Sequence, residues 1–398
     1  MPKNIVICSD GTGNSWGEQI SNVCRLVQSI ELSQAAQQIA FYDQGIGTDP
    51  RYANEVKGYK DKDREQRCGL TVLDPPYHAW WVPPPVARVA GLAVGYGLQR
   101  NVRELYTALA GAYEEKDCIY LFGFSRGAFT VRVLAGLIFR CGLLPKGTGN
   151  FDATFAKAYD LYTPHLQDFD AVKRFKRDQH VREPCVHFLG LWDTVKSYGG
   201  IWPQSLPHLR HNPIIGKVRH GLGLDEQRSW FLPTSWGGID SDRAMNDPRY
   251  KHQEIVEIWF RGCHSDVGGG YQDDAAARIP LRWMLNEAST AGLRLNQAGR
   301  ELAASSDLEC PALHESLTGG WLVTEYLPRF ELDNRYFPPK RFFKCGRTGQ
   351  RQPAQFSRQQ MVRLHSSVGP KHDIVTNYVD THVASSQDPH PIDGTSIT

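Results

Sequence analysis

The pentapeptide Gly123-Phe124-Ser125-Arg126-Gly127 constrains the fold more than any other stretch of this chain. Residues 118–122 before it form a short apolar run with β-branched and aromatic side chains, which is typical of a buried strand. Residues 128–144 after it carry apolar side chains at helical spacing. A G-x-S-x-G pattern can arise by chance in a chain with 37 glycines. Here, however, the strand and the helix around the pattern predict a nucleophile elbow.

The two glycines and the serine have separate roles in such a turn. Gly123 and Gly127 leave room where flanking side chains would collide with the tightly turned backbone. The turn exposes the Ser125 hydroxyl at the amino end of the following helix. There the backbone N–H of Arg126 can face a developing oxyanion, so the sequence predicts both a nucleophile and one oxyanion donor.

Two more buried-strand patterns end in residues that can complete a catalytic site. Residues 186–192 lead into Asp193, and residues 255–260 lead into a loop that contains His264. The carboxyl ends of parallel strands lie at one edge of a sheet, so we expect these side chains near Ser125. The order Ser, Asp, His is that of α/β-hydrolases, in which the acid orients the histidine that serves as base.

His365 is a second candidate for the base, because it also follows Asp193 in the chain. It lies near the end of an expected helix and has no strand before it. Histidines in such places more often have structural roles. The local sequence therefore favours His264.

The amino-terminal strand at residues 4–8 runs into a glycine-rich turn. The N–H groups of Gly11 and Thr12 could supply a second oxyanion donor. Asp10 could orient this loop or contact a substrate hydroxyl, and a plain turn held by its own side chains is an equal alternative. No G-K-[ST] follows, so the turn is not a phosphate loop.

Composition and charge exclude several classes of protein. The 398 residues are 41% hydrophobic and 22% charged, with 45 basic against 43 acidic side chains, a balance that gives no reason to expect nucleic-acid binding. Nine cysteines without C-x-x-C spacing indicate free thiols in a reducing compartment. We find no signal peptide and no apolar run long enough to span a membrane, so we expect synthesis in the cytoplasm and any export by a signal-independent route.

We expect one domain over residues 1–385, with lid-like insertions at 51–95 and 201–250 and a loose tail at 386–398. Residues 224–228 resemble a short helix within the second insertion. Trp80 and Trp81 lie among prolines that exclude regular structure. Their rings either face lipid or plug the core.

Several blocks of this sequence together resemble one protein family. They read "SDGTGN", "YDQGIGT", "LFGFSRGAFTVRVLAGLI", "FLGLWDTVKSYG", "GLDEQR" and "CHSDVGGGY", with a weaker block, "LHSSV", near residue 365. The set is similar to the α/β-hydrolase domain of the first class of type VI secretion phospholipase effectors. The resemblance implies a serine esterase acting on phospholipids, with Ser125 as nucleophile, Asp193 as acid and His264 as base. A secretion apparatus or an immunity protein is a further partner that it implies.

The sequence therefore predicts an α/β-hydrolase-like fold: a mostly parallel central sheet with helices on both faces and long loops over the active-site edge. The leading function is a phospholipase A-type serine esterase that contacts membrane surfaces transiently and needs no cofactor or metal. A metal-dependent phosphoesterase is the alternative, and its ligands would come from Asp10, Asp193, His264, Asp266 and Asp273. These residues lack familiar ligand spacing. A binding module that has lost its chemistry is a third reading, opposed by the three triad candidates.

Overall fold

The computed structural model describes most of the sheet and its helices. The described residues are 2–11, 20–44, 65, 67–73, 96–163, 168–195, 209, 212–236, 248–305, 312–319, 321–322, 325–326, 329–333, 340–344, 351 and 363–364. Thr12, Trp80, Trp81, His365 and the tail at 386–398 lie outside them, so the predictions for these residues remain predictions.

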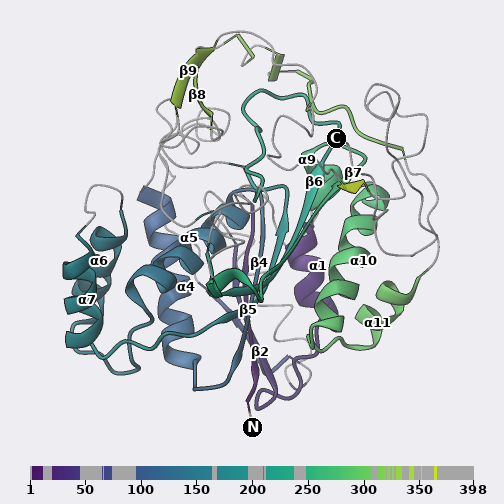
Figure 1. Ribbon diagram of the computed structural model, residues 1–398. Coiled ribbons are helices and arrows are strands. Elements are labelled where there is room, and N and C mark those ends of the chain that lie inside the picture. The colour runs from purple at the N-terminus through teal and green to yellow at the C-terminus, as the bar shows by residue number, and fades with distance from the viewer. Residues whose placement is uncertain are drawn as a thin grey trace, which may run out of the picture.

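An eight-stranded sheet, parallel at every pairing, forms the centre of the molecule (Figure 1). Its strand order is β10-β7-β6-β5-β4-β1-β2-β3. The strands are β1 (Asn4–Ser9), β2 (Gln38–Asp43), β3 (Leu70–Val72), β4 (Cys118–Phe124), β5 (Val186–Trp192), β6 (Ile215–Gly223), β7 (Glu254–Phe260) and β10 (Arg363–Leu364). A separate antiparallel pair joins β8 (Arg329–Asp333) to β9 (Lys340–Lys344).

Helices cover both faces of this sheet, because successive side chains of a strand point to opposite sides. One face packs against α4 (Tyr96–Ala112), α5 (Arg126–Cys141), α6 (Phe151–Tyr162) and α7 (Phe169–Asp178). The other packs against α1 (Asn22–Ser29) and α10 (Ala275–Thr290), with α11 (Gln297–Ala304) beside them (Figure 1). Strand β1 shows the alternation, since Ile5 and Ile7 join the first core and Val6 and Cys8 the second. The predicted α/β-hydrolase-like fold is confirmed.

Strand β6 corrects the prediction for residues 201–250, because it lies inside the sheet and not over it. The position of β6 within the sheet could not be recognised from its sequence, because Arg219 and His220 interrupt the apolar pattern of a buried strand. Arg219 forms ion pairs with Glu254 and Glu287, and His220 Nδ1 lies 2.8 Å from a Glu257 carboxylate oxygen. Paired charges can be buried in a central strand, whereas a sequence pattern shows only that they are polar.

The helix predicted at residues 224–228 is also wrong. This segment follows β6 as a bend and then residues without regular structure. The Glu226 carboxylate there accepts hydrogen bonds from the backbone and the side chain of Arg228, at 2.8 and 2.9 Å. The polar pattern that suggested a helix thus belongs to a loop held by its own side chains.

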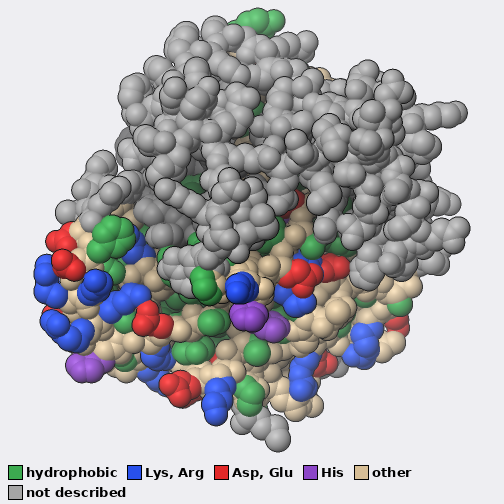
Figure 2. Space-filling view, viewed as in Figure 1, with side chains coloured by type: hydrophobic (Ala, Val, Ile, Leu, Met, Phe, Trp, Pro, Cys, Tyr) green, Lys and Arg blue, Asp and Glu red, His purple; other side chains and the backbone are tan. Residues whose placement is uncertain are grey.

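Surface charge agrees with the balanced composition. On the visible described surface in Figure 2, basic and acidic side chains lie interspersed. Within the described part of the chain, every helix is too short or too polar to cross a membrane. The seven cysteines that the structure describes are all free, and four of them, Cys8, Cys24, Cys141 and Cys263, are buried.

Candidate active site

Ser125 lies at the sharp turn between β4 and α5, with backbone angles of φ 57° and ψ −120°. A positive φ is unfavourable for a residue with a side chain, so the surrounding structure must hold this conformation. The Ser125 N–H donates to the Trp192 carbonyl of the neighbouring strand over 3.0 Å. The strand, turn and helix that the sequence predicted are therefore present, and the serine lies at the carboxyl edge of the sheet.

Gly127 allows this turn to pack against the end of β1. A Cβ atom at Gly127 would overlap the Ser9 carbonyl group and would lie 2.6 Å from the Asp10 carbonyl oxygen. A Cβ at Gly123 would lie 2.6 Å from the backbone of Ala128. Both glycines of the pentapeptide are thus required by backbone atoms that cannot move aside.

The structure brings three side chains into one hydrogen-bonded series. The Ser125 Oγ lies 2.8 Å from His264 Nε2, and His264 Nδ1 lies 2.5 Å from Asp193 Oδ2. Asp193 follows β5 directly, and His264 is the first residue of the short helix α9 (His264–Gly268). In a neutral imidazole with its proton on Nδ1, the histidine donates to Asp193 and accepts the serine hydroxyl proton at Nε2.

Two aromatic rings and a carboxylate hold His264 in place. The rings of Phe124 and Phe231 have their centroids 4.6 and 4.9 Å from the imidazole. The backbone N–H of His264 donates to Glu226 Oε2 over 3.1 Å. The Arg228 guanidinium forms an ion pair with the same carboxylate. Burial raises the pKa of Glu226, but Arg228 outweighs it and brings that pKa to about 2.

Burial and charge act in opposite directions at the pair of Asp193 and His264. Burial alone would raise the pKa of Asp193, but the Arg351 guanidinium and His264 outweigh it and hold that pKa well below its usual range. For His264, burial lowers the pKa and the Asp193 carboxylate only partly offsets this. Around neutral pH the arrangement is therefore an ionised aspartate beside a neutral histidine, as a general base requires.

Arg351 is a residue of this site that sequence reasoning missed. Its two terminal nitrogens donate to the two carboxylate oxygens of Asp193, at 2.6 Å and 3.0 Å. It lies 158 residues after Asp193, in a polar stretch with no strand or motif to mark it. No local pattern in the sequence points to this contact.

The predicted oxyanion donors are the N–H groups of Arg126, Gly11 and Thr12, and the structure describes the first two. Arg126 is the first residue of α5, so its N–H lies in the first turn of that helix. The Gly11 N–H donates to Asp10 Oδ1 over 2.6 Å, which corrects the expectation that this group is available for an oxyanion. Thr12 lies outside the described residues.

Asp10 is buried, and its carboxylate contacts the turn after β1 and residues at or near α1 and β2. Its Oδ2 accepts hydrogen bonds from Ser21 at 2.5 Å and Tyr42 at 2.8 Å, and Cys24 Sγ lies 3.2 Å away. These bonds lower the pKa of Asp10, but burial outweighs them and raises it. The carboxylate thus faces inward to α1 and β2.

The remaining predicted carboxylates have local partners. Asp266 accepts the Cys263 N–H at 3.0 Å and contacts His314 Nδ1 at 2.6 Å. Asp273 is exposed and accepts the Ala275 N–H. Among the described residues, no three His, Cys, Asp or Glu side chains gather as metal ligands would. The ligand set of the metal-dependent alternative is therefore not assembled within this part of the chain.

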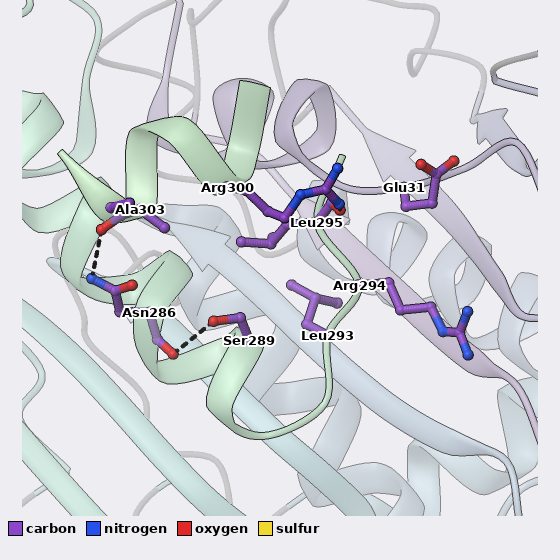
Figure 3. Close-up of a pocket in the computed structure, with 9 residues that line it drawn as sticks. Glu31, Asn286, Ser289, Leu293, Arg294, Leu295, Arg300 and Ala303 are labelled. Atoms are coloured by element: carbon purple, nitrogen blue, oxygen red, sulfur yellow. Dashed lines mark hydrogen bonds between the residues drawn. The ribbon is translucent and has the colours of Figure 1, made fainter. Parts of the chain in front are cut away.

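A groove of about 540 Å³ between α10 and α11 lies at the other end of the sheet (Figure 3). Asn286 and Ser289 line it from α10, and Arg300 lines it from α11. The Arg294 N–H donates to Gln38, the first residue of β2, so the groove borders the amino ends of the strands. It is separate from Ser125, which follows the carboxyl end of β4.

Comparison with known proteins decides the family. A family model described as "T6SS, Phospholipase effector Tle1-like, catalytic domain" matches residues 3–287, more than half of the chain. The chain belongs to this family. The Tle1-like match contains Ser125, Asp193 and His264 and ends before Arg351.

Individual proteins similar to this Tle1-like chain have sequence identities between 17% and 32%. "Uncharacterized protein YEL023C" of Saccharomyces cerevisiae is 32% identical over 241 residues, which cover 58% of this chain and 32% of the yeast protein. The chain thus spans about a third of the length of that curated relative. An uncharacterized protein from Pseudomonas aeruginosa is 18% identical with a TM-score of 0.40, over 76% of this chain and 48% of that one. A Tle1 effector bound to the VgrG spike of the type VI secretion system is 17% identical with a TM-score of 0.38, over 77% of each chain.

Proposed function

We propose that this chain is a serine carboxylester hydrolase of the phospholipase A type, which releases fatty acid from membrane phospholipids. The hydrogen-bonded series from Ser125 through His264 to Asp193 carries the proposal, because a serine hydroxyl is a poor nucleophile without an adjacent base. Membership of the Tle1-like family supports phospholipids as the substrate class.

In the proposed reaction, His264 Nε2 takes the Ser125 proton as Oγ attacks the acyl carbonyl carbon. The tetrahedral intermediate collapses, the ester C–O bond breaks, and His264 returns the proton to the departing lysophospholipid oxygen. Water, deprotonated by His264, then attacks the acyl-enzyme and releases the fatty acid. Asp193 keeps the imidazole in the required tautomer and stabilises the imidazolium that forms in each half-reaction.

The Arg126 N–H is the proposed first donor to the oxyanion, because it belongs to the first turn of α5, directly after the nucleophile. Thr12 is the proposed second donor, since the Gly11 N–H is bonded to Asp10. In this arrangement Asp10 affects the site indirectly, through its hydrogen bond with the turn that follows β1.

The pH dependence of kcat/KM should follow the protonation of His264. Burial lowers the pKa of His264 below its ordinary value of 6.5, and a general base acts only when neutral. We therefore expect kcat/KM to rise with pH through a midpoint below 6.5, measured with a water-soluble ester across the acid and neutral range. A midpoint above 6.5 would contradict this assignment of the base.

Product analysis on defined phospholipids tests the proposed function as a whole. The wild type should release fatty acid and lysophospholipid, and Ser125→Ala should release neither. A metal-dependent phosphoesterase would instead cleave a phosphate ester and leave both acyl chains on the glycerol. Release of a phosphate-bearing head group, retained in Ser125→Ala and lost on dialysis against EDTA, would overturn the proposal.

A phospholipase must reach its substrate at a lipid surface, and we propose Trp80 and Trp81 as the contact. Replacing both by alanine should weaken binding to anionic phospholipid vesicles and spare turnover of a water-soluble ester. Vesicle sedimentation and the soluble assay measure the two effects separately. Equal losses in both assays, with a lowered melting temperature, would show that these rings are part of the core.

Delivery out of the cell by a type VI secretion apparatus belongs to the same proposal, and the description of the family supports it. An immunity protein in the producing cell would be its counterpart. Secretion of the tagged chain from cells with the apparatus, compared with cells in which it is inactivated, tests this route. Equal amounts in both culture media would count against it.

A further inference from the structure

Arg351 makes four hydrogen bonds through its two terminal nitrogens. Only 4% of the residue is exposed. Besides the two bonds to Asp193, one terminal nitrogen donates to the Gly223 carbonyl over 2.8 Å, and the other donates to the Phe231 carbonyl. The guanidinium therefore joins Asp193 to the end of β6 and to the segment that carries Phe231, whose ring packs on His264.

Asp193 needs such support because its own backbone is strained. Its φ of 38° lies in the left-handed region, which is unfavourable for a residue with a side chain. The Gly223 N–H donates to Oδ1 at 3.0 Å, and Oδ2 is shared between His264 and Arg351. A planar guanidinium bonded to both oxygens fixes the plane of the carboxylate, which a single N–H does not.

We propose that Arg351 is a positioning residue of the reaction: its fork holds the Asp193 carboxylate in the plane that aligns His264 with Ser125. The inference rests on the proposed serine hydrolase function. It also gives the chain beyond the family match a part in that function, since Arg351 lies after residue 287.

The contact between Arg351 and Asp193 should also affect the pKa of His264. Asp193 and Glu226 raise the pKa of His264, and Arg228 lowers it together with burial. Arg351 neutralises part of the Asp193 charge, so its removal should let the carboxylate stabilise the imidazolium more strongly. The pKa of His264 would then rise, and the acid limb of kcat/KM would move to higher pH.

Arg351→Met and Arg351→Lys separate the two effects on a water-soluble ester. We expect Arg351→Met to lower kcat by about 100-fold, as a misplaced catalytic group does, with little change in KM. Its acid-limb midpoint should rise by about one pH unit. Arg351→Lys keeps the charge but not the fork, so the midpoint should return toward the wild type while kcat recovers only in part.

Arg182→Met is the matched control. Arg182 also donates to backbone carbonyls, those of Tyr113, Ala110 and Leu144, but it lies beside the end of α4, away from the serine. Its replacement should lower the melting temperature and leave the pH midpoint unchanged. Ser125→Ala, assayed in parallel, tests the function itself: full activity there would overturn the proposed function rather than the role of Arg351.

Two results would overturn the inference while Ser125 remains essential. One is wild-type kcat and pH midpoint in Arg351→Met. The other is a loss of activity that follows the melting temperature with an unchanged midpoint, as in a merely structural role. Should Arg351→Met fail to fold, Arg351→Lys decides the question, because wild-type kcat in that variant would show that the fork is not needed.

Discussion

Ser125→Ala should lower kcat on a water-soluble ester by a factor of about 10⁵ to 10⁶, which is the loss expected when a triad nucleophile is removed. The residual activity would come from substrate binding and oxyanion stabilisation alone. The fold should persist, because the substitution removes only one hydroxyl, which contacts His264 at the edge of the sheet. Circular dichroism and the melting temperature should match those of the wild type.

Ser289→Ala is the matched control for this experiment. The Ser289 hydroxyl donates to the Asn286 carbonyl in the groove at the other end of the sheet (Figure 3). Its removal deletes one hydroxyl without touching the site, so activity should be unchanged. If Ser125→Ala keeps more than a few per cent of wild-type activity, Ser125 is not the nucleophile.

His264→Ala should lose nearly as much activity as Ser125→Ala. Without the imidazole, no base lies within hydrogen-bond reach of the serine among its described contacts. Because members of a triad act as a unit, the double variant Ser125→Ala/His264→Ala should be little worse than either single variant. Rates of ester hydrolysis for the three variants, measured side by side, give the non-additivity directly.

His365→Ala distinguishes the two candidate histidines. We expect a loss of about tenfold or less, through local packing. A loss equal to that of Ser125→Ala, together with an active His264→Ala, would show that His365 is the base. The contact of His264 with the serine would then be only structural.

The parts of the site that the sequence predicted depend on local patterns. Ser125 follows a strand and precedes a helix within one continuous stretch, so its turn could be recognised without knowledge of the rest of the chain. Asp193 and His264 each follow a buried strand, and the common edge of a parallel sheet explains why they approach Ser125.

The parts that were missed depend on partners far away in the sequence. Strand β6 carries Arg219 and His220, whose burial is explained only by acidic residues of β7 and α10. Arg351 has no local signal, and its position is decided by Asp193. The bond from Gly11 to Asp10 reflects a network with Tyr42 that a turn sequence does not show.

Labelling with a fluorophosphonate probe tests the central claim most directly, because the probe reacts with a serine that an adjacent base has activated. We expect one adduct per chain, located on Ser125 by mass spectrometry of the digested protein, with loss of esterase activity in step with labelling. Ser125→Ala and His264→Ala should remain unlabelled under the same conditions. An active enzyme that is not labelled at Ser125, or whose activity survives complete labelling there, would contradict the serine mechanism.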